Sequence, residues 1–182
     1  MTWEVLTWQR WQLISHVQVP MVNGWENFHR LIRPDFVSGL NGMFQGDRQA
    51  RAGGHKAATI LVVDANPLQP SALPSADSYE FLSVWEGKSV WKNEVTVRSI
   101  EAFRAYDPSH AIARISPTPL LMIVADNDYV TPTDLALTAY ARALEPKQLV
   151  ILPGGHFDAY REPNIIPSIE QQVGFLQRTL CK

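Results

Sequence analysis

Two short runs of consecutive apolar residues lie near the C-terminal end of the chain, and a helical pattern separates them. Residues Leu120–Ala125 and Leu149–Leu152 show no alternation with polar residues, which is typical of parallel strands covered on both faces. Between them, Thr131 is a good N-cap and Pro132 suits the first helical position. The apolar positions of this helix share one face: Leu137, Tyr140 and Leu144. The pattern predicts a strand, a helix and a second parallel strand.

Polar residues that can act in catalysis or ligand binding follow both strands. Asp126 and Asp128 come directly after the first, and His156 follows the second after Pro153, Gly154 and Gly155. Open α/β sheets bind their ligands at the carboxyl ends of such strands. Taken alone, however, an aspartate there is more often a turn residue, and a histidine in a glycine-rich loop is more often a surface residue.

Further apolar patterns extend the predicted sheet and cover it. Leu13–Val19 is predicted to be a strand that Pro20 ends. The last residues carry an amphipathic helical pattern, which we expect to pack on the sheet through Ile169, Val173, Leu176 and Leu180.

Residues 20–115 are predicted to be a cap over the sheet, built of short helices and proline-rich loops. Asn23 and Glu26 form a potential capping box for a helix over Trp25–Ile32, which Pro34 closes. Later elements of the cap are a weak helical pattern at Val37, Leu40 and Phe44, an apolar run at Thr59–Val63 that reads as a strand, and helices from Ser75 to Gly87 and over Trp91–Tyr106.

Composition narrows the class of protein. The chain has 182 residues, 46% of them hydrophobic, which suits a single globular domain with a real core. A net charge of -2 gives no electrostatic footprint for nucleic acid or anionic membranes, so we expect small-molecule partners. The single cysteine, Cys181, excludes an internal disulfide, and no run is long enough to span a membrane. We expect a soluble, cytoplasmic protein without a cofactor.

The histidines do not suggest a metal site. Apart from His156 they lack ligand spacing and a repeated carboxylate partner: His16, His29, His55 and His110. We therefore expect no metal.

The stretch from Ser116 to Tyr160 resembles the C-terminal third of an α/β hydrolase. The motifs are Asp128 three residues before Thr131-Pro132, and Gly155-His156-Phe157 after the next strand. More narrowly, VPMVNGWENFHRLIRPDF and ISPTPLLMIVADNDYVTPTDLAL resemble fungal hydrolases akin to polyketide transferases, many from secondary-metabolite gene clusters. The resemblance implies that Asp128 is the acid and His156 the base of a catalytic triad, with Asp126 as the alternative acid. It also implies that residues 20–115 are the lid, which overrides the strand at Thr59–Val63.

The third member of such a triad is not found in the sequence. An α/β hydrolase carries its nucleophile on a G-x-S-x-G turn that precedes the acid and the histidine. Here the nearest sequence is Gly87-Lys88-Ser89-Val90-Trp91, which lacks the last glycine and lies in the lid, while Cys181 follows the histidine. We therefore expect an incomplete α/β-hydrolase domain, truncated before residue 1, with segments 1–19, 20–115 and 116–182 as sixth-strand, lid and C-terminal regions.

Two functions follow as expectations. The first is a hydrolase or acyltransferase acting on an ester, thioester or polyketide-like intermediate of secondary metabolism, with its nucleophile outside this chain. The alternative is a non-catalytic remnant or binding module for an apolar metabolite or a partner chain. The aromatic lid residues Trp85, Trp91, Phe103 and Tyr106 are expected in the lid core, and could also line an acyl pocket. A sheet reduced to about three strands leaves an edge open, so we also expect self-association.

Overall fold

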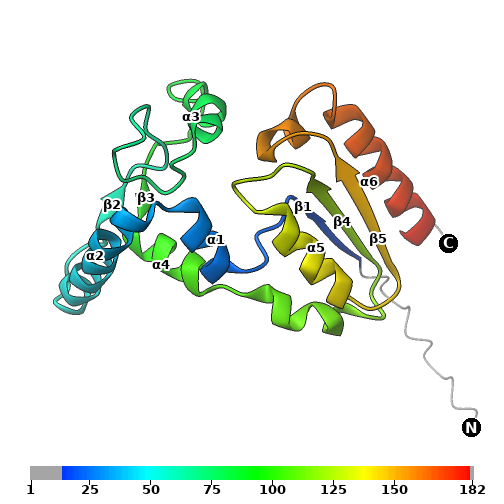
Figure 1. The fold of residues 1–182 in the computed structure, drawn as a ribbon, viewed down its shortest axis with the longest axis horizontal. Helices are drawn as coiled ribbons and strands as arrows, with labels where there is room; N and C mark the ends of the chain where they lie inside the picture. The colour runs from blue at the N-terminus through cyan, green and yellow to red at the C-terminus, as the bar shows by residue number, and fades with distance from the viewer. Residues whose placement is uncertain (1–13, 181–182) are drawn as a thin grey trace, which may run out of the picture.

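A three-stranded parallel sheet forms one half of the molecule in a computed structural model that describes residues 14–180 (Figure 1). Strands β1 (Ser15–Gln18), β4 (Leu120–Ala125) and β5 (Lys147–Leu152) lie in the order β1-β4-β5. Leu120 of the central strand is in register with Ser15 on one side and Lys147 on the other. The predicted strands are confirmed, and residue 13 of the first prediction lies outside the described residues.

Strand β4 is buried along its whole length because both of its faces are covered. Leu120, Met122 and Val124 pack against helix α5 (Thr133–Arg142) and the 3-10 helix η1 (Pro108–Ile115). The alternate residues Leu121 and Ile123 pack on the opposite face with Phe175 of helix α6 (Ile165–Leu180). Figure 1 shows α5 and α6 on the two sides of the sheet. Two-sided burial explains why this strand has no polar alternation.

The start of α5 differs from the sequence-based prediction. Pro132 is the N-cap and Thr133 the first helical residue, so Thr131 does not cap the helix. Instead, the Thr133 hydroxyl donates to the Ala125 carbonyl at 2.7 Å, and the Thr131 side chain turns toward Asp128. Asp134 lies in the first helical turn, where a carboxylate complements the helix dipole.

Helix α6 exists as predicted but is rotated relative to the prediction. The residues it buries are Ser168 and Phe175. The apolar stripe that was expected to face the sheet is exposed, with Ile169, Val173, Leu176 and Leu180 each between 37% and 46% accessible. A 3.6-residue period identifies a face of a helix but does not say which neighbour covers it.

The other half of the molecule is a separate helical layer, here called the lid, at the left of Figure 1. It contains helices α1 (Gly24–Leu31), α2 (Pro34–Ala52), α3 (Ala76–Ser83) and α4 (Val97–Ala105), with strands β2 (Thr59–Ile60) and β3 (Val95–Thr96). Its core packs Phe28 and Ile32 against Phe44 of α2 and Ile100 of α4. The lid therefore has apolar packing of its own.

Several lid predictions require correction. Asn23 caps α1 by accepting the Glu26 N–H at 2.9 Å, and α1 ends before Pro34, both as expected; the structure adds that Pro34 is also the first residue of α2. A two-residue strand, β2, does form within Thr59–Val63 and pairs antiparallel with β3, so discarding that strand was wrong in part. Residues 91–94 are not helical, because β3 precedes α4, and α3 ends at Ser83 before reaching Gly87.

Within the lid, the Gly24 N–H at the start of α1 donates to the Tyr106 carbonyl at the end of α4 at 2.8 Å. Two side chains of α1 then join the lid to the half of the molecule that contains the sheet. The buried Asn27 side chain donates to the Val130 carbonyl at 2.9 Å. Arg30 donates to both oxygens of Asp134 at 2.7 and 2.8 Å, and this hydrogen bond holds the pKa of the Asp134 carboxyl below its ordinary value. These contacts fix the lid beside the loops that follow β4.

Within residues 14–180, no helix is both long enough and apolar enough to cross a membrane.

Candidate active site

The loop after β4 holds Asp128 in one orientation. Its side chain is almost fully buried, and Oδ1 accepts the N–H groups of Val130 and Thr131, both at 2.8 Å. The Asp128 N–H donates in turn to the Thr133 hydroxyl at 3.1 Å. Two amide donors stabilise the ionised carboxylate and leave Oδ2 free to face the neighbouring strand.

The loop after β5 brings His156 to that oxygen. Gly154 has a φ of 98°, a conformation that glycine adopts without strain and side-chain-bearing residues rarely do. The Gly154 N–H donates to Asp126 Oδ1 at 2.8 Å, and the Gly155 N–H donates to Asp158 Oδ2 at 2.7 Å. The loop is thus held at both glycines, and His156 begins the 3-10 helix η2 (His156–Tyr160).

His156 and Asp128 form a hydrogen-bonded pair. Nδ1 of His156 lies 2.9 Å from Oδ2 of Asp128, and the two side chains are 14% and 2% exposed. An ionised carboxylate can only accept, so Nδ1 carries the proton and Nε2 keeps its lone pair. This tautomer makes Nε2 the basic nitrogen of the ring, which is the state required of a general base.

A third polar side chain, that of Thr131, joins this pair, although the sequence pattern indicated only a helix cap at this position. Thr131 Oγ1 lies 2.9 Å from Asp128 Oδ2, 3.1 Å from His156 Nδ1 and 3.0 Å from the Val19 carbonyl oxygen. The spacing of three residues from Asp128 was visible, but the proximity to the end of β1 depends on the folded sheet.

Aromatic side chains surround the imidazole. Phe157 meets His156 edge-on with ring centroids 4.9 Å apart, and the Tyr160 ring is 6.2 Å away. Phe81 of the lid stacks on Phe157 at 4.5 Å. Burial raises the pKa of the Tyr160 phenol, and the negative charge of Asp128 raises it further. This apolar wall suits an apolar group held next to His156.

A cleft of about 540 Å³ opens between the lid and the loop after β4, beside Asp128; His156 is not among its lining residues. Its lining includes Arg30 and Arg33 from the lid and Asn127, Asp128 and Tyr129 from the loop. The cleft is large enough for a small-molecule substrate.

The four aromatic residues suggested for an acyl pocket are dispersed within the lid. Trp85 is 49% exposed, and Trp91 is half-buried on the loop before β3. Phe103 packs in the lid core, while Tyr106 is 56% exposed and lines a different, apolar cavity. The lid-core expectation holds for Phe103, the exposure of Trp85 and Tyr106 contradicts it for those two, and the pocket role stays a prediction.

The remaining candidates are distant from the His156 ring or bonded elsewhere. Asp126, the alternative acid, is exposed and accepts from Gly154. Ser89 Oγ donates to the Trp85 carbonyl at 3.2 Å and accepts the Trp91 N–H at 3.1 Å, both within the lid. Cys181 lies outside the described residues. Among residues 14–180, no side chain hydrogen-bonds Nε2 of His156, and no three potential metal ligands are clustered.

Comparisons with known proteins agree with this architecture. No family model matches the sequence. A thiohydrolase of Eupenicillium brefeldianum is 25% identical over 150 residues, which are 79% of this chain and 49% of that protein. A polyketide transferase of Gibberella fujikuroi is 35% identical over 91 residues, which are 49% of this chain and 28% of that protein. The chain thus spans about half the length, or less, of the curated relatives it matches.

The crystal structure of the α/β hydrolase GrgF from Penicillium sp. sh18 shares the fold. Its TM-score is 0.71 at 21% identity, over 92% of this chain and 55% of that one. The parallel sheet with helices on both faces fits that fold. The chain therefore shares its fold with an α/β hydrolase, over the part of that fold that these residues cover.

Proposed function

We propose that the chain forms the lid and the acid–base half of an acyl-processing α/β hydrolase, whose nucleophile lies on a segment outside these 182 residues. The observation that carries the proposal is the buried pair of Asp128 and His156, 2.9 Å apart, with Nε2 left unbonded among the described residues. A pair in this tautomer is built to take a proton from a neighbouring hydroxyl or thiol.

In the proposed reaction, Nε2 of His156 removes the proton of the nucleophile as it attacks the acyl carbonyl. Asp128 stabilises the imidazolium that results. The tetrahedral intermediate collapses when Nε2 returns the proton to the leaving alcohol or thiol, and an acyl-enzyme remains. Water or an acceptor alcohol then attacks the acyl-enzyme by the same two proton transfers, which gives hydrolysis or acyl transfer.

The proposed substrates are esters or thioesters with an apolar, polyketide-like acyl group, made in secondary metabolism. The names of the two similar fungal proteins, a thiohydrolase and a polyketide transferase, support this class. The wall of Phe157, Tyr160 and Phe81 beside His156 supports an apolar acyl group.

The test uses the longest reading frame that contains these 182 residues in the genomic DNA. We expect that frame to encode a G-x-S-x-G or G-x-C-x-G turn upstream, and its product to cleave simple acyl thioesters. His156→Ala should lower kcat by at least about 10⁴-fold. Asp128→Asn should cost about 10⁴-fold, because it reverses the imidazole tautomer.

Asp126→Asn provides the matched comparison, since both aspartates follow β4 but only Asp128 contacts the imidazole. We expect it to cost far less than Asp128→Asn. A frame without a nucleophile turn, or stoichiometric labelling of Ser89 in the 182-residue chain by a fluorophosphonate, would contradict the proposal.

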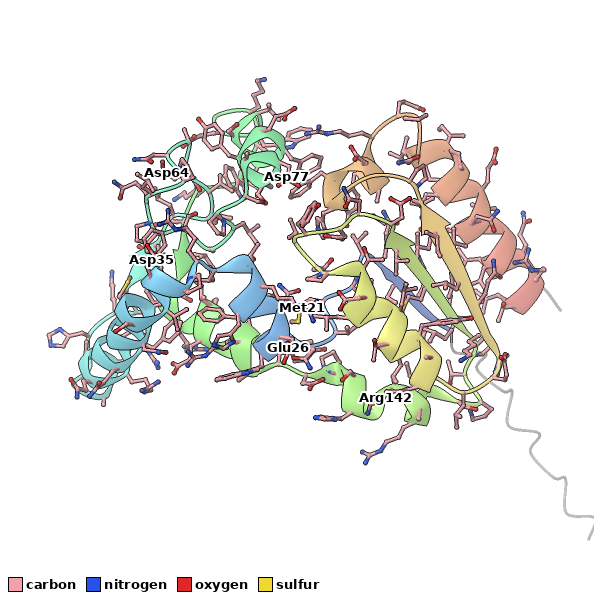
Figure 2. The ribbon with its side chains drawn as sticks, in the orientation of Figure 1. Met21, Glu26, Asp35, Asp64, Asp77 and Arg142 are labelled. Carbon is pink, nitrogen blue, oxygen red and sulfur yellow. The ribbon has the colours of Figure 1, made fainter. Side chains whose placement is uncertain are left out.

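The second candidate is a binding module for an apolar metabolite. It is supported by an apolar cavity of about 260 Å³ between β1, β4 and η1, lined by Val17, Met21 and Met122 among others; Met21 is labelled in Figure 2. Absence of probe labelling together with saturable binding of an apolar fluorophore, weakened by Met122→Lys, would favour this function.

A further inference from the structure

The hydroxyl of Thr131 has more hydrogen-bond partners than it has protons. It lies within 3.1 Å of the Val19 carbonyl, the Asp128 carboxylate and His156 Nδ1. A threonine hydroxyl has one proton and two lone pairs, and both the carbonyl and the ionised carboxylate can only accept. The proton therefore serves one of two acceptors, and the oxygen accepts from the imidazole.

The backbone of Val19 indicates which acceptor receives the proton. Val19 has a φ of 39°, a strained conformation that is uncommon for a β-branched residue. The Val19 N–H still donates to the Ile123 carbonyl at 2.8 Å, but the Val19 carbonyl takes no part in the hydrogen bonds between β1 and β4. Val19 is 5% exposed, and the Thr131 hydroxyl is the donor that reaches this carbonyl among residues 14–180.

A buried carbonyl without a donor is costly, so the Thr131 proton is directed to Val19. The lone pairs of Oγ1 then face Nδ1 of His156. The Nδ1–H group has two acceptors side by side, Asp128 Oδ2 at 2.9 Å and Thr131 Oγ1 at 3.1 Å. The second acceptor restricts rotation of the imidazole and opposes the tautomer that would place the proton on Nε2.

We propose that Thr131 is a positioning residue, which fixes the orientation and tautomer of His156 by linking Nδ1 to the strained end of β1. It acts through His156 and does not touch the substrate. The catalytic role of Thr131 rests on the proposed function. Its hydrogen bonds do not, because all of them lie within the 182-residue chain.

The test is nuclear magnetic resonance of the ¹⁵N-labelled 182-residue chain. The Nδ1–H proton of His156 should give a protected downfield signal, and the ¹⁵N shifts should report the Nδ1–H tautomer. Thr131→Val keeps the shape of the side chain but removes its hydroxyl. We expect the Nδ1–H signal of His156 to move upfield or to be lost to exchange with water, and the Nε2–H tautomer to appear in the ¹⁵N shifts. Thr131→Ser keeps the hydroxyl and should preserve the native signal. If Thr131→Val does not fold, Thr131→Ala serves the same purpose.

Asp128→Asn separates the two proposals. If it abolishes the native Nδ1–H signal while Thr131→Val leaves that signal and the tautomer unchanged, the positioning role is overturned and the acid–base pair stands. Equal effects of Thr131→Ser and Thr131→Val would also overturn it, since a variant that keeps the hydroxyl would then behave like one that lacks it. If Asp128→Asn itself has no effect, the pair and the proposed function both fail.

Discussion

Gly24 is a residue at which two helices of the lid, α1 and α4, approach closely through their backbones. Its N–H bonds the Tyr106 carbonyl, and a Cβ at this position would overlap the carbonyl oxygen of Phe103. Both obstacles are backbone atoms, which cannot move aside as a flexible side chain can. The close packing of α1 against the end of α4 therefore depends on the absence of a side chain here.

We predict that Gly24→Ala destabilises the protein by about 1–3 kcal/mol or more, since overpacking against fixed atoms has costs of this size. The matched control is Gly39→Ala in α2, where nothing lies within 4 Å of the added Cβ. That change should stabilise by about 0.5–1 kcal/mol, the ordinary gain of alanine over glycine in a helix. Urea unfolding followed by circular dichroism measures both, and similar effects of the two variants would contradict the close approach.

At the level of single residues, the sequence predicted that Asp128 and His156 directly follow two strands and that Asn23 caps a helix. It could do so because turn and cap chemistry act within a few residues. The contact of Thr131 with Val19 spans 112 residues of chain and leaves no local signature. The aromatic contact of Phe81 with Phe157 was missed for the same reason, although an aromatic residue next to a loop histidine is a usable signal.

The contact between α3 and η2 is the element-scale feature closest to the candidate site. Phe81 stacks on Phe157, and the guanidinium of Arg161 lies 4.9 Å from the centre of the Phe81 ring. Arg161 is also 3.6 Å from Glu80. In Figure 2, Asp77 marks the start of α3 in the upper part of the lid, across from η2. This contact joins the lid to the helix that carries His156.

We predict that Phe81→Ala loosens this contact, because an aromatic pair contributes about 0.5–1.5 kcal/mol beyond its buried area. Amide hydrogen exchange should accelerate in α3 and η2 and remain unchanged in β4. Tyr79→Ala is the control, since Tyr79 lies on the same helix, is 37% exposed and is not part of the aromatic cluster. Equal acceleration by both variants would show that α3 helicity, not the stacking, had been disturbed.

Strands and helices were predicted correctly where the residue pattern itself carries the information, and less well where distant parts of the chain decide. Strand β4 was recognised in full, because burial on both faces removes all polar residues from it. Helix α2 runs for 19 residues and contains three glycines. The low helix propensity of these glycines is offset by the burial of Leu40 and Phe44 in the lid core. The orientation of α6 was wrong, because the residues that cover a helix face come from elsewhere in the chain.

The surface of the whole molecule has two features that invite association. Strand β1 has β4 as its one neighbouring strand among the described residues. The N–H groups of Ser15 and Val19 point toward β4, and because successive N–H groups of a strand point to opposite sides, the N–H of His16 points away from β4. Helix α6 exposes the apolar stripe Ile169, Val173, Leu176 and Leu180. An open strand edge and an exposed apolar stripe both favour contact with another polypeptide.

We therefore predict that the 182-residue chain self-associates in solution. Val173→Lys should lower the average mass measured by light scattering, since it introduces a charge into the apolar stripe. His16→Pro should do the same at the strand edge, because it removes an outward donor. Gln171→Lys is the charge-matched control, as Gln171 is exposed on the side of α6 opposite Val173, and should have little effect. A monomer for the unmodified chain at all concentrations would contradict the prediction.

The sequence by itself determined the parallel strands, the lid between them and the order in which acid and histidine follow the last two strands. These features arise from local periodicity, caps and turns, which are written in neighbouring residues. Only the tertiary structure decided that Asp128, His156 and Thr131 meet with Val19, that Phe81 reaches Phe157, and which face of α6 is buried. Those outcomes depend on long-range packing, in which residues far apart in the chain compete for the same buried space.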